Sequence, residues 1–419
     1  MAFGTALTGL NAASEALNVT GNNIANAGTT GFKESRAEFG DIYSVAYGGI
    51  NNRAIGQGTQ LQAVAQQFSQ GSLNNTGNAL DLAINGKGFF VFNNNGSQVY
   101  SRAGALQVNR DGVVVNALNQ PLQVYAPTNV SNTNPTFNQG SLSDLTLSTA
   151  SGKPQATTSV NAVVNLSAKA PDLGAGTINP TDPTTYTYST PLTVYDSLGA
   201  SHTAVVYFRK DTTTPATSTT QGSTTWDVLT QIDGQTVTSN PTQLTFNDNG
   251  ALTSPSNGNI SISGYNPGNG AAPMAFTLGL NGSSMFGDSN SVNSLTQNGY
   301  AAGRLSGLSI SDTGVISANY TNGQTQALGQ VALADFPNPQ GLQSIGNTEW
   351  AQTYDSGTVR LGAAGTGTFG SIQSGALENS NVDLAKQLVD LITEQRNYQA
   401  NAKTISTANA VTQTIIQMA

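Results

Sequence analysis

The sequence predicts a mainly β protein with α-helical termini, and three observations support this fold class. Apolar residues recur at alternating steps of four and three residues at both ends of the chain, which is the spacing of an apolar helix stripe. Between the ends, roughly 350 residues carry short segments with period two, separated by turn residues. Only 9% of the residues are charged, against roughly 25% in an ordinary globular protein. Helices with so little charge favour pairing with each other and with neighbouring copies.

The first predicted helix lies within residues 1–28. Its stripe comprises Phe3, Leu7, Leu10, Ser14, Leu17, Gly21 and Ile24. Glu15 is its one charged residue, so we expect this helix to be covered on most sides. Gly28 and Gly31 end the helix, because glycine accepts the left-handed backbone that closes one.

Residues 29–72 have a mixed composition that argues against a compact unit. The stretch contains Gly48, Gly49, Gly56 and Gly58. Such a run of glycines predicts an extended connector.

From Ala79 the period becomes two, which predicts short antiparallel strands. The expected strands are 80–84, 89–92, 99–101, 106–108, 113–115 and 122–125. After Pro127 a stretch rich in Ser, Thr, Asn and Pro reaches about Thr158, which is typical of a domain boundary.

Two further β regions follow, and they share one turn chemistry. Strands are expected at 160–166, 192–195, 204–208, 226–232, 244–246 and 274–280, and again at 308–310, 315–320 and 331–336. A Thr-rich loop is expected at 212–225. The turns at 109–112, 247–250 and 311–314 repeat one hairpin phrase without a fixed period, so we expect hairpins and not a solenoid.

The last forty residues or so return to helix. Residues 380–383 (SNVD) have the form of a capping box. The apolar stripe of this helix comprises Leu377, Leu384, Leu388, Leu391, Tyr398, Ala402 and Ile405, and it continues through Val411 and Ile415. Residues 404–419 carry no charge, so this end is also expected to be packed on several sides.

Composition excludes much chemistry. The chain has no cysteine and one histidine, which removes thiolate metal sites, disulfides and every site that needs two imidazoles. The net charge is −8 and the pI about 4.5, so nucleic acid is not an expected partner. No run of eighteen apolar residues exists, so no membrane insertion is expected.

The remaining motifs have structural explanations. The GxGxxG spacing at 365–370 lacks a helix directly after it, so a flexible linker is the preferred interpretation. The calcium-like turns at 109–112 and 247–250 lack a glutamate at the twelfth position. His202 is expected on the surface, and no paired carboxylates face one another across a cleft. We therefore expect no catalytic site, no cofactor and no metal.

Both ends of the chain resemble one family. Residues 7–13 (LTGLNAA), 21–27 (GNNIANA) and 30–33 (TGFK) are similar to the N-terminal signature of bacterial flagellar rod and hook proteins. Residues 377–384 (LENSNVDL) and 395–403 (QRNYQANAK) are similar to the C-terminal signature. Two such signatures at opposite ends are a specific combination.

The middle of the chain resembles the hook members of this family more than the rod members. Residues 81–90 (DLAINGKGFF) and 100–104 (YSRAG) resemble the β domain common to both, whereas 192–280 resembles the outer domain of hook proteins. Hook-like segments also occur at 297–300, 328–331 and 347–350. The resemblance implies two antiparallel β domains, the outer one inserted in the inner one.

This organisation gives four expected parts. They are a terminal helical domain (1–28 and 378–419), a connector (29–72 and 360–377), an inner β domain (73–146 and 297–359) and an inserted outer β domain (147–296). The terminal helices are expected to pair as a coiled-coil-like domain. The residues expected at the assembly interface are Phe3, Leu7, Leu10, Leu17, Ile24, Leu384, Leu388, Leu391, Tyr398, Ile405, Val411 and Ile415.

The resemblance implies a non-enzymatic subunit that polymerises into a curved tube between rod and filament and transmits torque as a universal joint. It also implies partners, namely rod, hook cap and hook-filament junction proteins and the flagellar export apparatus. The implied location is extracellular, after export without a cleaved signal peptide. Two alternatives are a distal rod subunit and, in another class, a secreted β-rich adhesin or glycan-binding enzyme.

Overall fold

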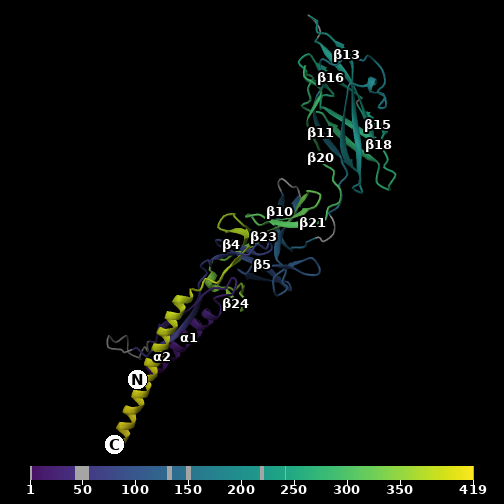
Figure 1. Cartoon of the computed structure of the whole chain (residues 1–419). Coiled ribbons are helices and arrows are strands. Elements are labelled where there is room, and N and C mark those ends of the chain that lie inside the picture. The colour runs from purple at the N-terminus through teal and green to yellow at the C-terminus, as the bar shows by residue number, and fades with distance from the viewer. Residues whose placement is uncertain are drawn as a thin grey trace. The chain divides into compact units, whose positions relative to one another are not determined.

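The computed structural model describes residues 2–42, 56–129, 135–147, 152–217, 221–240 and 242–418 (Figure 1). The chain divides into two compact units. The first unit contains residues 1–149, 307–319 and 325–419, and the second contains 150–306 and 320–324. Strands fill both units, and the two long helices come from the two ends of the chain (Figure 1). The predicted fold class, mainly β with α-helical termini, is confirmed.

The two terminal helices lie side by side in the first unit (Figure 1). They are α1 (Ala2–Ala25) and α2 (Leu384–Met418). At the start of α2 the Asp383 carboxylate accepts hydrogen bonds from the backbone N–H groups of Ala385 and Lys386, at 2.9 and 3.2 Å. Asp383 is therefore the residue that caps the helix, at the end of the expected capping segment.

The region expected as an extended connector contains a β hairpin. Strands β1 (Ser35–Asp41) and β2 (Thr59–Gln66) pair antiparallel, and both contact α1. Residues 35–41 and 59–66 thus differ from an extended connector without internal pairing, because their backbone hydrogen bonds go to each other. Gly48 and Gly49 lie outside the described residues.

The rest of the first unit is built from sixteen short strands. They are β3 (Leu73–Asn75), β4 (Leu82–Asn85), β5 (Phe89–Asn94), β6 (Ser97–Ser101), β7 (Gln107–Val108), β8 (Val114–Val115), β9 (Gln123–Asn129), β10 (Thr136–Asp144), β21 (Leu305–Ile310), β22 (Val315–Tyr320), β23 (Thr325–Asp335), β24 (Gln343–Gly346), β25 (Glu349–Ala351), β26 (Arg360–Ala363), β27 (Ser371–Ser374) and β28 (Ala376–Glu378). A short 3-10 helix, η2, spans Pro339–Gly341. The main sheet has the order β10-β9-β23-β5-β6-β25-β24.

Two stretches expected to be linkers are part of these sheets. Strand β10 lies within the expected boundary after Pro127 and pairs with β9. Residues 360–377 hold β26, β27 and the start of β28, which pair with β23, β4 and β3. The strands that pair with β26, β27 and β28 lie more than twenty residues away in the chain, which local composition does not reveal.

The second unit is one ten-stranded sheet with its own core. Its strands are β11 (Ser159–Asn165), β12 (Tyr188–Tyr195), β13 (Ser201–Thr214), β14 (Ser223–Ile232), β15 (Gln235–Asn240), β16 (Gln243–Asn247), β17 (Leu252–Ser254), β18 (Asn259–Tyr265), β19 (Met274–Gly279) and β20 (Ser291–Gln297), with the 3-10 helix η1 at Pro183–Thr185. Trp226, Phe208 and Phe246 are fully buried at its centre. The strands extend into both ends of the Thr-rich stretch 212–225, since β13 pairs with β14 as far as Thr214 and Ser223, while residues 218–220 lie outside the described residues. The unit reaches Ser306, ten residues beyond the expected boundary at 296.

Turn chemistry explains the repeated hairpin phrases. The side-chain oxygen of Asn109 accepts hydrogen bonds from the backbone of Asp111 and Val113, and that of Asn247 accepts from Asn249 and Ala251. The GxGxxG stretch is a closed turn and not a flexible linker, because the Gly365 N–H donates to the Gly370 carbonyl at 3.0 Å. In the described part of the chain, neither helix is long and apolar enough to cross a membrane.

Candidate assembly interface

Glu378 lies at the centre of a buried ion network in the first unit. Its Oε1 accepts a hydrogen bond from Lys33 Nζ at 2.6 Å, and its Oε2 accepts one from Arg102 Nη1 at 3.1 Å. The side chains of Lys33 and Glu378 are 0% exposed, and that of Arg102 is 5% exposed. The Gly71 N–H donates to Oε1 at 2.9 Å. The network joins the segment after α1, the segment before β3, the end of β6 and the strand before α2.

The charges of this network depend on one another. Burial lowers the pKa of Lys33 and of Arg102, and the Glu378 carboxylate acts in the opposite direction on both. A buried charge that loses its partner costs several kcal/mol, roughly 3 to 5, because water no longer solvates it. Glu378 is therefore required to keep Lys33 and Arg102 buried and charged.

A second contact, between two side-chain amides, sets the position of the two helices. Asn23 of α1 donates from Nδ2 to Gln387 Oε1 at 3.1 Å and to the Ser35 carbonyl at 2.8 Å. Gln387 of α2 donates from Nε2 to Glu34 Oε1 at 2.9 Å. Asn23 and Gln387 are buried, so these bonds form away from water. Buried amides that satisfy each other fix one alignment of α1 against α2.

Small residues of α1 face α2. Ala6, Ala13 and Ala16 are buried, and a Cβ atom added to Gly9 would lie 2.9 Å from Asn401 Oδ1. The helices therefore approach closely along this face. The expected seam lies one residue later at each step, which rotates it by about 100° around α1. The stripe is therefore not the face that contacts α2 within one chain, where small side chains permit the close approach.

The expected interface residues remain exposed or half-buried in the single chain. Phe3, Leu7, Leu384, Leu388, Tyr398, Val411 and Ile415 are exposed, and Leu10, Leu17, Ile24, Leu391 and Ile405 are half-buried. Four further apolar residues of α2 are exposed and were missed by the stripe: Val389, Ile392, Ile416 and Met418. We call these residues together the apolar helix surface. A period-counting argument misses Val389 and Ile392 because they lie beside the stripe.

The end of α2 extends past the helix pair. Gly9 of α1 lies opposite Asn401, and Ala408 is the last residue of α2 that is half-buried. Residues 409–418 are all exposed. This overhang of ten residues is about 15 Å long at 1.5 Å per residue.

His202 was expected on the surface, and it is half-buried there. Its side chain is 10% exposed and lies between Asp196 and Asp233 in the second unit. Among the described residues, no group of three or more His, Cys, Asp or Glu side chains is placed to hold a metal ion.

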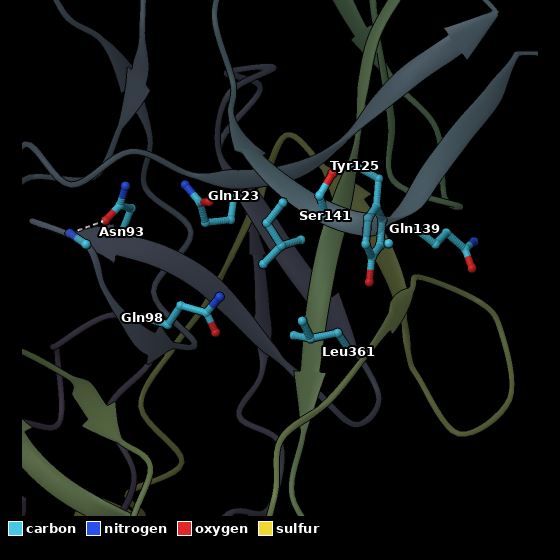
Figure 2. Close-up of a pocket in the computed structure, with 10 residues that line it drawn as sticks. Asn93, Gln98, Gln123, Tyr125, Gln139, Ser141 and Leu361 are labelled. Carbon is cyan, nitrogen blue, oxygen red and sulfur yellow. Dashed lines mark hydrogen bonds between the residues drawn. The ribbon is translucent and has the colours of Figure 1, made fainter.

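The inner sheet carries a pocket of about 340 Å³ lined by amides (Figure 2). Asn93, Gln98, Gln123 and Gln139 line it together with Tyr125. Asp144 accepts a hydrogen bond from Gln123. Figure 2 shows these side chains at separate places around the pocket, without a shared contact point. The pocket is a surface of interchangeable hydrogen-bonding groups.

Sequence reasoning missed the Lys33–Glu378–Arg102 network. Lys33 and Glu378 are 345 residues apart, so no local pattern links them. The sequence did offer one signal for this network. Charged residues make up only 9% of the chain, yet Lys33 and Glu378 both lie within the terminal signature segments.

Four family models match parts of the chain. They are the flagella basal body rod protein (residues 3–33), the flagellar hook protein FlgE/F/G D1 domain (83–154), the flagellar basal body protein FlaE D2 domain (164–300) and the flagellar basal body rod FlgEFG protein C-terminal (373–418). The matched segments include both terminal helices and both units.

Curated relatives match over the whole length. The flagellar hook protein FlgE of Escherichia coli (strain K12) is 38% identical over 423 residues, covering 100% of both chains. The Salmonella typhimurium protein of the same name is 37% identical with the same coverage, and the Borreliella burgdorferi protein is 33% identical over 96% of both chains. The crystal structure of Helicobacter pylori flagellar hook protein FlgE2 shares the fold, with a TM-score of 0.56 at 16% identity, covering 73% of this chain and 100% of that one. The chain belongs to the family of bacterial flagellar hook proteins.

Proposed function

We propose that this hook protein polymerises into the curved tube of the flagellar hook through its terminal helices. The observation that carries the proposal is the apolar helix surface, which one chain leaves open to water. Exposed side chains of this size each gain about 1.5 to 3 kcal/mol when fully buried. Leu388, Val411 and Ile415 are at least half exposed, so neighbouring copies gain most by covering α2.

The β units supply contacts that rearrange. With 9% charged residues, the chain has few ion pairs to hold one fixed arrangement of neighbours. Amides and hydroxyls, as in the pocket of Figure 2, exchange hydrogen-bond partners at small cost. Neighbouring units therefore slide while the helices hold, which is what a universal joint needs to transmit motor torque while bent.

The parts of the chain take separate roles in this proposal. The helices and the connector of the first unit form the inner wall of the tube, the β sheets of that unit form the middle, and the second unit lies at the outer radius. The subunit is not an enzyme. Its partners are further copies, the rod, hook cap and hook-filament junction proteins and the export apparatus, which carries it out of the cell without a cleaved signal peptide.

Electron microscopy of the purified protein under polymerising conditions tests the proposal. Curved tubes are the expected product. Straight rods instead favour the distal rod alternative, and the absence of any polymer at high concentration overturns assembly through this surface.

A further inference from the structure

The chain has one histidine, and it lies in a cluster that the assembly proposal does not use. His202 is the second residue of β13 in the second unit. Its ring meets the Tyr265 ring edge to face, with centroids 5.3 Å apart. The ring is 10% exposed and Asp196 0%, whereas Asp233 is 41% exposed, so the cluster reaches the surface on the Asp233 side.

Both ring nitrogens of His202 face carboxylate oxygens. Nδ1 lies 2.7 Å from Asp233 Oδ2, and Nε2 lies 3.3 Å from Asp196 Oδ2. An ionised carboxylate can only accept hydrogen bonds, and a neutral imidazole has a single N–H. Two donated bonds need two N–H groups, so this geometry calls for the imidazolium form.

The two carboxylates are held ionised by other donors. Asp196 also accepts from the Asn269 side chain at 2.6 Å and from the backbone N–H groups of Leu198 and Ala200 at 2.9 Å. Asp233 accepts from the Tyr265 hydroxyl at 2.7 Å and from the Thr203 N–H at 2.9 Å. These donated hydrogen bonds stabilise the ionised form of both carboxylates, so the proton resides on the ring and not on Asp196 or Asp233.

The cluster joins three connections of the second unit. Asp196 belongs to the turn between β12 and β13, Asp233 to the turn between β14 and β15, and Tyr265 ends β18. Asn269 lies in the loop that follows β18. Asp196, Asp233 and Tyr265 are the titratable groups that face the ring from these elements. A positively charged His202 ring attracts the carboxylates of both Asp196 and Asp233 and so links the two turns.

We propose that His202 is a pH-sensitive clasp that fastens this end of the second unit while it is charged and loosens it when it loses a proton as the pH rises. Burial by itself lowers the pKa of His202, but the hydrogen bonds and charges of Asp233 and Asp196 outweigh burial and raise it above 6.5. The stabilisation is therefore complete below pH 6.5 and is lost as the pH rises through the raised value. The inference goes beyond assembly and holds for the single subunit.

A single histidine makes the test direct. The full-length protein, kept monomeric and labelled with ¹⁵N-histidine, gives ring nitrogen signals from one residue. We expect the titration of the ring to give an apparent pKa above 6.5, and this pKa to fall in Asp233→Asn. An apparent pKa of 6.5 or below overturns the inference.

Hydrogen exchange tests the loosening itself. Above the pKa, the amides of 196–200 and 265–271 should exchange several-fold faster than the ordinary pH dependence requires, while β11 serves as the internal control. In His202→Gln, which donates a hydrogen bond but does not titrate in this range, the extra step should vanish. A step that persists in this variant contradicts the clasp, and the ring titration of the unmodified chain decides the matter if the variant does not fold.

Discussion

Replacing Glu378 by Gln tests the buried ion network most directly. The change keeps the size of the side chain and removes its charge. Lys33, at 0% exposure, and Arg102, at 5%, then remain as two buried cations without a counter-charge. Because breaking one buried pair costs about 3 to 5 kcal/mol, we expect the first unit to lose at least that much stability.

The two tryptophans allow each unit to be followed separately. Trp350 is buried in the first unit and Trp226 in the second. Trp226→Phe leaves Trp350 as the one reporter, and the Trp226 Nε1–H has no partner among the described residues, so phenylalanine loses no hydrogen bond there. With a urea m-value of about 3 kcal/mol/M, the Trp350 transition should move down by about 1 M or more in Glu378→Gln.

The matched control is a surface pair of the same unit. Arg36 and Glu38 form an ion pair at 2.6 Å with side chains 65% and 43% exposed, so Glu38→Gln should cost less than about 1 kcal/mol. With Trp350→Phe, the transition reported by Trp226 should stay unchanged by Glu378→Gln. A loss of under about 1 kcal/mol in the first unit, or an equal shift in both units, refutes the reasoning.

Three further outcomes follow from the structure. Leu388→Asp places a charge on the apolar helix surface and should abolish polymerisation without moving the Trp350 transition. The same substitution at Leu118, a comparably exposed leucine in the loop between β8 and β9, should still polymerise; sedimentation measures both, and tubes from Leu388→Asp speak against the surface. A protease of broad specificity should remove the overhang (409–418) from the monomer and leave it intact in the polymer, as mass spectrometry can show, and equal trimming in both states contradicts its burial on assembly. Burial raises the pKa of Asp196, but hydrogen bonds from Asn269, two backbone amides and His202 outweigh it and lower the pKa to about 2. The second unit should therefore lose roughly 2 kcal/mol as the pH falls from about 4 to 2, followed by Trp226 fluorescence, and Asp196→Asn should remove this loss.

The sequence predicted the elements better than their contacts. Period-two segments located β11 and β14, because buried and less buried residues alternate along both strands. The β1–β2 hairpin was not predicted, since its residues are half-buried or exposed and show no clear alternation of apolar and polar residues. Local pattern carries little information on such marginal strands.

The face of α1 that contacts α2 was not predicted, for a similar reason. Periodicity marks the largest apolar residues, and these lie on the surface that one chain leaves exposed, whereas Ala13 and Gly9 form the close contact with α2. A sequence pattern does not distinguish a face that packs within the chain from one that packs against another copy. The ion network and the His202 cluster join residues far apart in the chain, so they could be found only in the fold.

The position of Glu378 also bears on the order in which the chain matures. Synthesis proceeds from the N-terminus, and domains fold as their residues become available. The second unit is complete once residue 324 has been synthesised. The carboxylate that pairs with Lys33 and Arg102 is added more than fifty residues later. A chain cut short before residue 378 carries two cations that its interior does not accept. In such a fragment Lys33 and Arg102 lack their counter-charge, so we expect its first unit to be less stable than that of a chain that includes Glu378.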